Sequence, residues 1–313
     1  MNIVGVDVGA TKIAAGVIST EGKVLGRVRY PTAKTPEKLL SGIVRVVSEV
    51  RDGFEVEAVC VAVPGLLLSQ ESMVVYSPNL HAIEGIRLKD ELQPQIELPL
   101  TVENDNSAAA WGEFRFGAGK GTNYLVFIGI GTGIGGGIVI QGQLVRGAQG
   151  AAGELGHVTI QATGPRCACG NRGCLEAFAS GTAIGRRARE VAREKPNSAL
   201  GLLAAEREVL GEDVTRLALA GDRVALSVLK EVARWLGIGL AGFVNVFNPE
   251  VVVVGGGAME GGLMLGAARE EIRLRAQSPG RDLVEVREAA LGLDSGVIGA
   301  AALARDLSGE LLL

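Results

Sequence analysis

Two segments of the chain share one pattern, an apolar strand, a tight glycine-containing turn and a second apolar strand. The first spans residues 2–18 with its turn at 9–12, and the second begins about 120 residues later at 124–140 with its turn at 131–137. Apolar runs of strand length joined by so few residues predict β-hairpins. Because the same hairpin begins each half, we expect an internally duplicated α/β protein whose two domains have mixed sheets.

The length and composition agree with two folded domains. The 313 residues exceed the ~100–150 residues of one ordinary core. Lys and Arg number 31 and Asp and Glu 35, giving a net charge of −4, so the basic surface of a nucleic-acid-binding protein is missing. The apolar runs are shorter than the ~20 residues that cross a bilayer, and the N-terminus lacks a signal-peptide pattern. We therefore expect a cytoplasmic protein that binds neither nucleic acid nor membranes.

Apolar periodicity between the hairpins predicts alternating strands and helices. The expected strands are 24–30, 58–63, 100–102 and 251–254, and the expected helices are one starting at Pro36, 107–116, 223–247 and one from about 295 to 307. The glycine-rich segment 117–122 predicts a hinge. We expect a smaller N-terminal domain at 1–117, completed by a C-terminal helix at 297–313, and a larger domain at 118–296.

The two turns are suited to phosphate. The first combines exposed backbone N–H groups with a carboxylate and a hydroxyl, which can hold phosphate and hydrated Mg²⁺, and the second has almost no side chains. The candidate residues are Asp7, Gly9, Thr11 and Lys12 in the first turn and Gly131, Thr132, Gly133 and Gly135 in the second. A single glycine turn is more often an ordinary hairpin, but two matched turns indicate a nucleotide bound between two domains.

Other glycine patterns are less specific. The letters GTGIGG match a dinucleotide-binding fingerprint, but the strand-like residues 137–140 follow instead of a helix, which argues against that fold. Gly256 and Gly257 follow the buried strand 251–254 and could admit a base or ribose. An ordinary strand-to-helix turn explains them equally well.

Asp105 follows Glu103 and Asn104 where a strand becomes a helix. An aspartate there can simply cap the helix. Near two phosphate turns, it can instead take the proton of a hydroxyl that attacks a γ-phosphate.

One loop holds an imidazole and three thiols. His157, Cys167, Cys169 and Cys174 offer four ligands for tetrahedral coordination of a structural metal, and chance clustering of free cysteines is the alternative. Glu154 and Glu176 flank these residues, and they are either solvated surface charges or ligands for sugar hydroxyls.

Several motifs together resemble those of one family. The segments VGVDVGATK, VENDNSAAAWGE, IGIGTGIGGGIV, GAAGELGH and CACGNRGCLEAFAS resemble, in order and spacing, the ROK family of sugar kinases and sugar-responsive repressors. The resemblance covers nearly the whole chain and is strongest to the bacterial ATP-dependent glucokinases of that family. It implies the actin-like (ribonuclease H-like) ATPase fold, with duplicated mixed-sheet domains around a nucleotide cleft.

The resemblance also implies an activity and a residue for each role. It implies transfer of the γ-phosphoryl group of ATP to the 6-hydroxyl of glucose, with Asp105 as general base, Mg²⁺ bound with ATP and structural Zn²⁺. The implied sugar contacts are Gly65, Asn79, Asn104, Asp105, Glu154, His157 and Glu176, and the implied zinc ligands are His157, Cys167, Cys169 and Cys174. The two turns match the phosphate motifs, Gly256 and Gly257 match the adenosine contact, and a homodimer or homotetramer is implied.

Two departures from the family pattern leave alternatives open. Ala10 replaces a common glycine, and the uncharged residues 66–68 occupy a loop that often carries an aspartate. The first alternative is therefore a kinase for mannose, fructose, N-acetylglucosamine or N-acetylmannosamine, and polyphosphate or ADP could be the donor. A sugar-sensing regulator is the second, and we do not expect it because Met1 is followed at once by the first strand.

Overall fold

The computed structural model describes residues 2–310, and in this part the chain forms two compact units. Unit 1 contains the residues up to Gly121, the segment Gly137–Gly153 and the residues from Ala290 onwards. Unit 2 contains Thr122–Gly136 and Glu154–Ala289. The chain therefore passes between the units four times.

This division differs from the domains expected from the sequence in one internal segment and at two boundaries, where residues 118–121 and 290–296 also group with unit 1. Residues 137–153 group with unit 1, whereas the sequence analysis placed them in the larger domain. The last part of the expected C-terminal helix, residues 311–313, lies outside the described residues.

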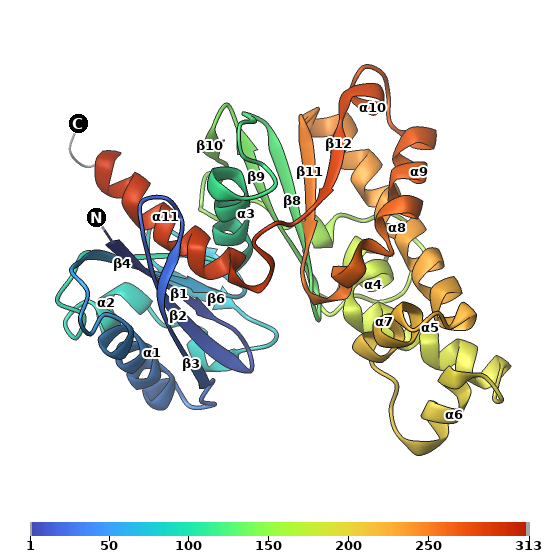
Figure 1. Ribbon diagram of the computed structural model, residues 1–313, viewed down its shortest axis with the longest axis horizontal. Helices are drawn as coiled ribbons and strands as arrows, with labels where there is room; N and C mark the ends of the chain where they lie inside the picture. The colour runs from blue at the N-terminus through green and yellow to red at the C-terminus, as the bar shows by residue number, and fades with distance from the viewer. Residues whose placement is uncertain (1, 311–313) are drawn as a thin grey trace. The chain divides into compact units, whose positions relative to one another are not determined.

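The sheet of unit 1 begins with the expected hairpin. Strands β1 (Asn2–Val8), β2 (Lys12–Ile18) and β3 (Val24–Pro31) pair antiparallel in sequence. Strand β4 (Val56–Val63) pairs parallel with β1, and β7 (Leu100–Asn104) pairs parallel with β4, which gives the order β3-β2-β1-β4-β7 (Figure 1). The carboxyl ends of the parallel strands β1, β4 and β7 meet at one edge, where ligands bind in open α/β sheets.

Helices cover both faces of this sheet. Side chains alternate along β1, so Val4 and Val6 belong to the core under α1 (Pro36–Val50). Gly5 faces the other side, where α11 (Ser295–Glu310) approaches so closely that a Cβ on Gly5 would lie 1.9 Å from the Val297 carbonyl oxygen. Helix α3 (Asp105–Phe116) packs against α11.

Smaller elements connect β4 to β7. Strands β5 (Leu66–Leu68) and β6 (Met73–Tyr76) form an antiparallel pair, followed by the one-turn helix η1 (His81–Ile83) and α2 (Leu88–Leu92). Gly65 lies between the carboxyl end of β4 and these elements, which return the chain to Leu100, where β7 starts beside Val59 of β4.

The second sheet repeats the strand order of the first. It contains β8 (Leu125–Ile130), β9 (Ile134–Ile140), β10 (Gln143–Leu144), β11 (Val251–Gly255) and β12 (Glu285–Glu288), in the order β10-β9-β8-β11-β12. When the strands of each sheet are numbered along the chain, both sheets have the same spatial order: third, second, first, fourth, fifth. The internal duplication predicted from the two hairpins is therefore confirmed.

Helices α4 (Leu175–Ala179), α5 (Gly181–Glu194), α6 (Ala199–Glu206), α7 (Gly211–Leu219), α8 (Arg223–Phe247), α9 (Leu265–Arg275) and α10 (Gly280–Leu283) belong to unit 2. The long apolar helix predicted at 223–247 is α8. The Asp222 side chain caps it by accepting hydrogen bonds from the N–H groups of Val224 and Ala225, and Asn248 ends it with φ of 43°.

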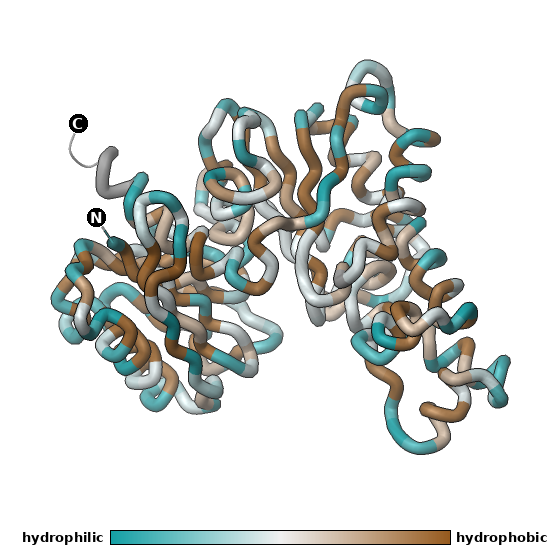
Figure 2. Tube along the Cα trace, viewed as in Figure 1, coloured by the Kyte–Doolittle hydropathy of each residue, from teal (hydrophilic) through white to brown (hydrophobic). Residues whose placement is uncertain are grey.

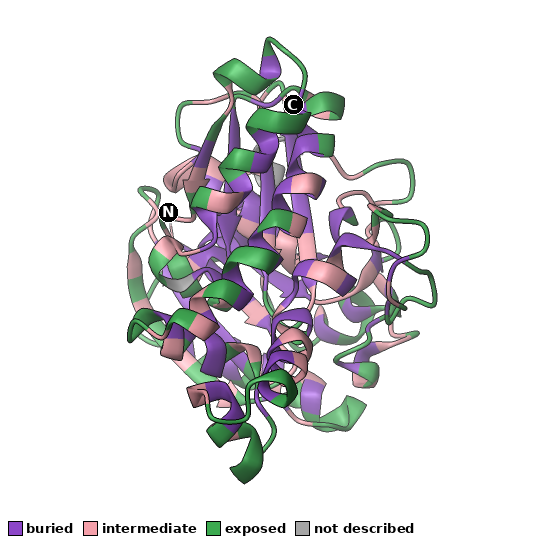
Figure 3. Ribbon diagram, turned by 90° about the vertical axis from the view of Figure 1, so that its right-hand side faces the viewer, coloured by how far each residue is buried: buried purple, intermediate pink, exposed green. Residues whose placement is uncertain are grey.

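Apolar side chains fill the interior of both sheets. The central strands follow brown segments in Figure 2, whereas α1 alternates between brown and teal. Figure 3 shows the same strands buried and the outer helix faces exposed. Among the described residues, no helix combines the length and the apolar character that a membrane crossing requires.

Candidate active site

The first phosphate turn is held by its own backbone and by the strand beside it. The Gly9 N–H donates to the Lys12 carbonyl at 2.8 Å, and the Thr32 hydroxyl donates to the Gly9 carbonyl at 2.6 Å. The Thr32 N–H donates to the Thr11 carbonyl at 3.0 Å. Thr11 and Lys12 are exposed, so their polar groups can meet a ligand.

Asp7 lies just before this turn and beside the start of α11. A Cβ on Gly296 would lie 3.0 Å from Asp7 Cγ, so the carboxylate is next to the positive end of the helix. Burial raises the pKa of the Asp7 carboxyl, and the charges of Lys12 and Arg29 oppose this rise. A cation bound at Asp7 would further stabilise its charged form.

The second turn is fixed to the start of α5. The Gly131 N–H donates to the Gly133 carbonyl at 3.0 Å, and the Gly181 N–H donates to the Gly131 carbonyl at 2.8 Å. The Thr182 hydroxyl donates to the Thr132 carbonyl at 2.8 Å. Gly131 and Thr132 are exposed, so the turn presents backbone with little side-chain cover.

Three of the glycines that the sequence placed in this turn lie elsewhere. Gly135, Gly136 and Gly137 belong to β9. At Gly137 a Cβ would lie 2.3 Å from the Ala110 Cβ, so this glycine permits close packing on α3. The predicted turn at 131–137 is therefore too long, and the turn is confined to Gly131–Gly133.

The third glycine turn follows β11. Gly256 has φ of +95°, and a Cβ there would lie 2.3 Å from the Ile130 carbonyl oxygen. At Gly257 a Cβ would meet nothing within 4 Å. Only glycine fits the first position, and the open space at the second leaves room for a ligand.

Asp105 is the first residue of α3, and its neighbour makes the cap. The Asn104 side-chain oxygen accepts the N–H groups of Asn106 at 2.9 Å and Ser107 at 3.0 Å. Asp105 Oδ1 accepts the backbone N–H of Asn106 at 2.8 Å and its side-chain N–H at 2.9 Å. The sequence left open whether Asp105 caps the helix. In the structure Asn104 makes the cap, and Asn106 orients the Asp105 carboxylate.

Asn104 also connects α3 to the loop after β4. Its side-chain N–H donates to the Gly65 carbonyl at 3.1 Å. Gly65 has φ of +104°, and a Cβ there would lie 2.2 Å from the Tyr76 carbonyl oxygen, so only glycine fits. Asn79 is exposed in the turn after β6. The structure therefore brings Gly65, Asn104 and Asp105 together, and Asn79 lies at the exposed turn after β6.

The four predicted metal ligands converge in unit 2. Their ligand atoms all lie within 4.8 Å of one another, with His157 Nδ1 3.6 Å from Cys167 Sγ and Cys169 Sγ 3.8 Å from Cys174 Sγ. Zinc bonds of ~2.3 Å to sulfur and ~2.0 Å to nitrogen at tetrahedral angles require separations of ~3.8 Å and ~3.5 Å. Burial raises the pKa values of the Cys167 and Cys174 thiols when no metal is bound. The donor set and spacing fit one tetrahedral zinc ion.

Glu176 links the metal cluster to the second phosphate turn. Its Oε2 accepts the Ile134 N–H at 2.9 Å, and its Oε1 accepts from Cys167 Sγ at 3.4 Å. The other flanking carboxylate, Glu154, has its Oε2 3.8 Å from His157 Nε2. Since His157 Nδ1 faces the thiols, its Nε2 faces Glu154. Glu154, His157 and Glu176 therefore lie around one cluster.

Two buried carboxylates, Glu103 in β7 and Glu113 in α3, were not among the site residues predicted from the sequence. Glu103 Oε2 accepts from Arg146 Nε at 2.8 Å, and its Oε1 accepts the Asn104 N–H at 3.0 Å. Glu113, at the other end of α3, accepts four hydrogen bonds. Several of their partners, Arg146, Leu291 and Ser295, are distant in sequence, so only the place of the two carboxylates in the segment ENDNSAAAWGE could have drawn attention to them.

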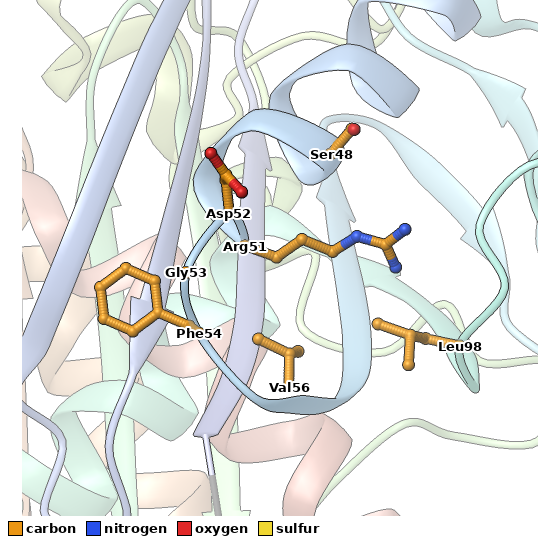
Figure 4. Close-up of a pocket in the computed structure, with 7 residues that line it drawn as sticks. All are labelled: Ser48, Arg51, Asp52, Gly53, Phe54, Val56 and Leu98. Atoms are coloured by element: carbon orange, nitrogen blue, oxygen red, sulfur yellow. The ribbon is translucent and has the colours of Figure 1, made fainter.

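A surface cavity lies away from all of these residues. It has a volume of about 390 Å³ and lies at the end of α1 (Figure 4). Its lining residues are Ser48, Arg51, Asp52, Gly53, Phe54, Val56 and Leu98. None of them belongs to the candidate site.

The chain is similar to known glucokinases over nearly its whole length. The model of the ROK family matches residues 3–307. The glucokinase of Streptomyces coelicolor is 40% identical over 309 residues, which cover 97% of each chain. The crystal structure of a ROK family glucokinase from Streptomyces griseus in complex with glucose and AMPPNP has a TM-score of 0.89 at 39% identity, covering 98% of this chain and 100% of that one. The ROK hexokinase from Thermus thermophilus has a TM-score of 0.84 at 34% identity, covering 99% and 100%.

The duplicated sheets, each beginning with a hairpin whose turn can hold phosphate, define a two-domain ATPase of the actin-like (ribonuclease H-like) fold. The chain belongs to the ROK family.

Proposed function

We propose that this protein is an ATP-dependent glucose kinase that transfers the γ-phosphoryl group of ATP to the sugar 6-hydroxyl. The observation that carries the proposal is the placement of Asp105 at the start of α3, where Asn104 makes the cap and Asn106 orients the carboxylate. The similarity to the glucokinase of Streptomyces coelicolor supports the choice of glucose.

In the proposed reaction Asp105 is the general base. It takes the proton of the 6-hydroxyl as that oxygen attacks the γ-phosphorus and the bond from phosphorus to the β,γ-bridging oxygen breaks. The products are glucose 6-phosphate and ADP, and no covalent intermediate on the enzyme is required.

The two turns and the third glycine turn would bind the nucleotide. The exposed residues Thr11 and Lys12 in the first turn and Gly131 and Thr132 in the second suit phosphate oxygens, and the space at Gly257 suits the adenosine. Asp7 would hold the hydrated Mg²⁺ that accompanies ATP and neutralises phosphate charge.

The candidate sugar-binding residues are Gly65, Asn79 and Asn104 in unit 1, and Glu154, His157 and Glu176 in unit 2. Zinc bound by His157, Cys167, Cys169 and Cys174 would order the loop that carries these groups. His157 would then direct Nε2 toward Glu154 and the sugar, because Nδ1 faces the thiols.

The first experiment compares the wild type with Asp105→Asn in a coupled assay with Mg-ATP and glucose. Asp222→Asn is the matched control, because it makes the same chemical change at a helix start in unit 2 and keeps a capping side chain. We expect kcat to fall by at least ~10² in Asp105→Asn and to stay within ~2-fold in the control. A variant Asp105→Asn with wild-type kcat would refute the assignment of the base.

Another hexose is the second candidate. Strand β5 (Leu66–Leu68) has no charged side chain, and the similar protein from Thermus thermophilus is named a hexokinase. A panel of glucose, mannose, fructose, N-acetylglucosamine and N-acetylmannosamine decides between them by kcat/KM. Substituting ADP or polyphosphate for ATP tests the donor in the same assay.

We also propose that the enzyme is cytoplasmic and works as a homodimer or homotetramer. The resemblance of its motifs to the ROK kinases supports both statements. Sedimentation velocity at micromolar concentration tests the assembly, and a single monomeric species would refute it.

A further inference from the structure

Glu113 is fully buried and accepts hydrogen bonds from two distant segments. Its Oε2 accepts the N–H groups of Ala118 at 2.8 Å and Ala290 at 3.0 Å. Its Oε1 accepts the Leu291 N–H at 2.9 Å and the Ser295 hydroxyl at 2.9 Å. A buried carboxylate is costly unless it is hydrogen-bonded, and four donors compensate this one.

Both segments are places where the chain passes between the units. Unit 1 ends for the first time at Gly121, just after Ala118, and resumes at Ala290. The backbone carbonyl of Glu113 also accepts the N–H groups of Gly117 at 3.0 Å and Gly119 at 2.9 Å. Of the four passages of the chain between the units, Glu113 therefore fixes the start of the first and the end of the last, which we call the two linkers.

Steric constraints keep this anchor in place. A Cβ on Gly117 would lie 2.0 Å from Glu113 Oε2, so residue 117 must be glycine for the carboxylate to take its position. A Cβ on Gly299 of α11 would lie 1.7 Å from the Ala108 carbonyl oxygen. A Cβ on Gly112, next to Glu113, would lie 2.7 Å from the Ser295 carbonyl oxygen, so α3 is in close contact with α11 from Ala108 to Gly112.

The neighbouring glycines differ from these. Gly121 and Gly292 have positive φ values of 87° and 56°, and a Cβ on either would meet nothing within 4 Å. Bending of the linkers is therefore easiest at these glycines, directly beside the residues that Glu113 holds.

The same helix begins with Asp105. Eight residues separate Asp105 from Glu113, so at 1.5 Å per residue the two lie about 12 Å apart on one rigid element. A displacement at the Glu113 end of α3 is therefore transmitted to the base, and a misplacement of ~1 Å can cost ~10²-fold in rate.

We propose that Glu113 is a positioning residue for phosphoryl transfer, which holds both linkers on the helix that carries the base. The inference rests on the proposed kinase function. It assigns a role in turnover to a residue that touches neither phosphate turn nor metal ligand among its described contacts.

The test uses Glu113→Gln with Glu271→Gln as the matched control. Glu271 is also a buried carboxylate, 2% exposed, but it binds Arg234 at 2.9 Å and Arg275 at 2.7 Å between α8 and α9, away from both linkers. The glutamine at 113 keeps the shape and cannot accept all four bonds, because its amide nitrogen is a donor.

We expect faster amide hydrogen exchange at Ala118, Ala290 and Leu291 in Glu113→Gln, with kcat lowered at least ~10-fold and the glucose KM within ~3-fold. Glu271→Gln should lose comparable or greater stability to urea and keep kcat. Wild-type kcat in Glu113→Gln despite the faster exchange would overturn the proposal, as would an equal loss of kcat in both variants.

Two milder variants serve if Glu113→Gln does not fold. Ser295→Ala removes one of the four donors, and Gly117→Ala displaces the carboxylate. Both should lower kcat, Gly117→Ala more strongly, and unchanged kcat in both would overturn the proposal. A wild-type protein that phosphorylates no sugar would instead refute the proposed function.

Discussion

Removing the metal from the cysteine loop should weaken sugar binding far more than it slows the chemical step. The loop between His157 and Cys174 has little packing of its own, since its buried apolar cluster contains only Cys167, Cys174 and Ala177 among the described residues. Two isolated bridges, Thr159 with Cys174 and Arg166 with Arg172, are its regular backbone pairings. Backbone hydrogen bonds such as those from the Ile160 and Gly173 N–H groups add to these pairings, and the four ligands would cross-link the segment when a metal is bound.

The magnitude follows from loop closure. Releasing a cross-link that closes ~15 residues frees about 3 kcal/mol of conformational entropy. If the sugar must order the loop again through Glu154, His157 and Glu176, its Kd rises by up to ~10², since 1.4 kcal/mol corresponds to tenfold. The proposed proton acceptor, Asp105, lies on α3 of unit 1, so kcat at saturating sugar should change by less than ~3-fold.

The assay measures zinc content, sugar affinity by calorimetry and steady-state kinetics for the native protein, for protein treated with a chelator, and for Cys169→Ser. Ala168→Ser is the control, because it alters an exposed neighbour that cannot be a ligand. We expect ~1 zinc per chain in the native protein and in the control. The reasoning fails if native protein contains no metal, or if metal-free protein binds the sugar with native affinity.

Three further predictions follow from particular contacts. Gly133→Ala should raise the KM for ATP at least ~10-fold, because its Cβ would lie 2.3 Å from Glu176 Oε2 and displace the acceptor of the Ile134 N–H. Steady-state kinetics test this prediction, and an unchanged KM for ATP would contradict it. Gly5→Ala should destabilise unit 1 by ~3 kcal/mol or more in urea unfolding, because α11 must move away from β1, and a native midpoint would contradict the packing. Arg207 holds the pKa of Asp213 far below its usual range, so this ion pair stabilises fully above pH ~5 and its contribution is lost as pH falls toward the lowered pKa. Asp213→Asn should therefore cost ~1–3 kcal/mol at pH 7 and less at pH 3, and an equal loss at both values would refute this assignment.

Local patterns were sufficient to predict much of the fold. The strands β1, β2 and β3 alternate or are continuously apolar, and α1 begins with Pro36 at its first turn, so each element has a signal in its own residues. The repeated hairpin predicted the duplication, which the strand order of the second sheet confirms. The convergence of His157 with the cysteines was predicted because ligand chemistry restricts which residue types can share a loop.

What the sequence could not predict depends on contacts between distant residues. Glycine is unfavourable in strands, so Gly135 to Gly137 were assigned to the turn, although close packing on Ala110 requires small residues in β9 there. The choice between Asn104 and Asp105 as cap depends on side-chain orientation, which the letters do not contain. The partners of Glu113 and Glu103 are brought near only by the fold.

The contact between β1 and α11 affects how the protein can be synthesised. β1 is synthesised before the other elements of both units, and α11, which covers it, is synthesised after them. Until α11 has been made, the face of the sheet that carries Gly5 is not covered by this helix. Unit 2 is continuous apart from residues 137–153, which belong to unit 1, and its last residue is Ala289, which is synthesised before α11. Vectorial synthesis thus allows unit 2 to fold first, and unit 1 closes only once α11 has been made.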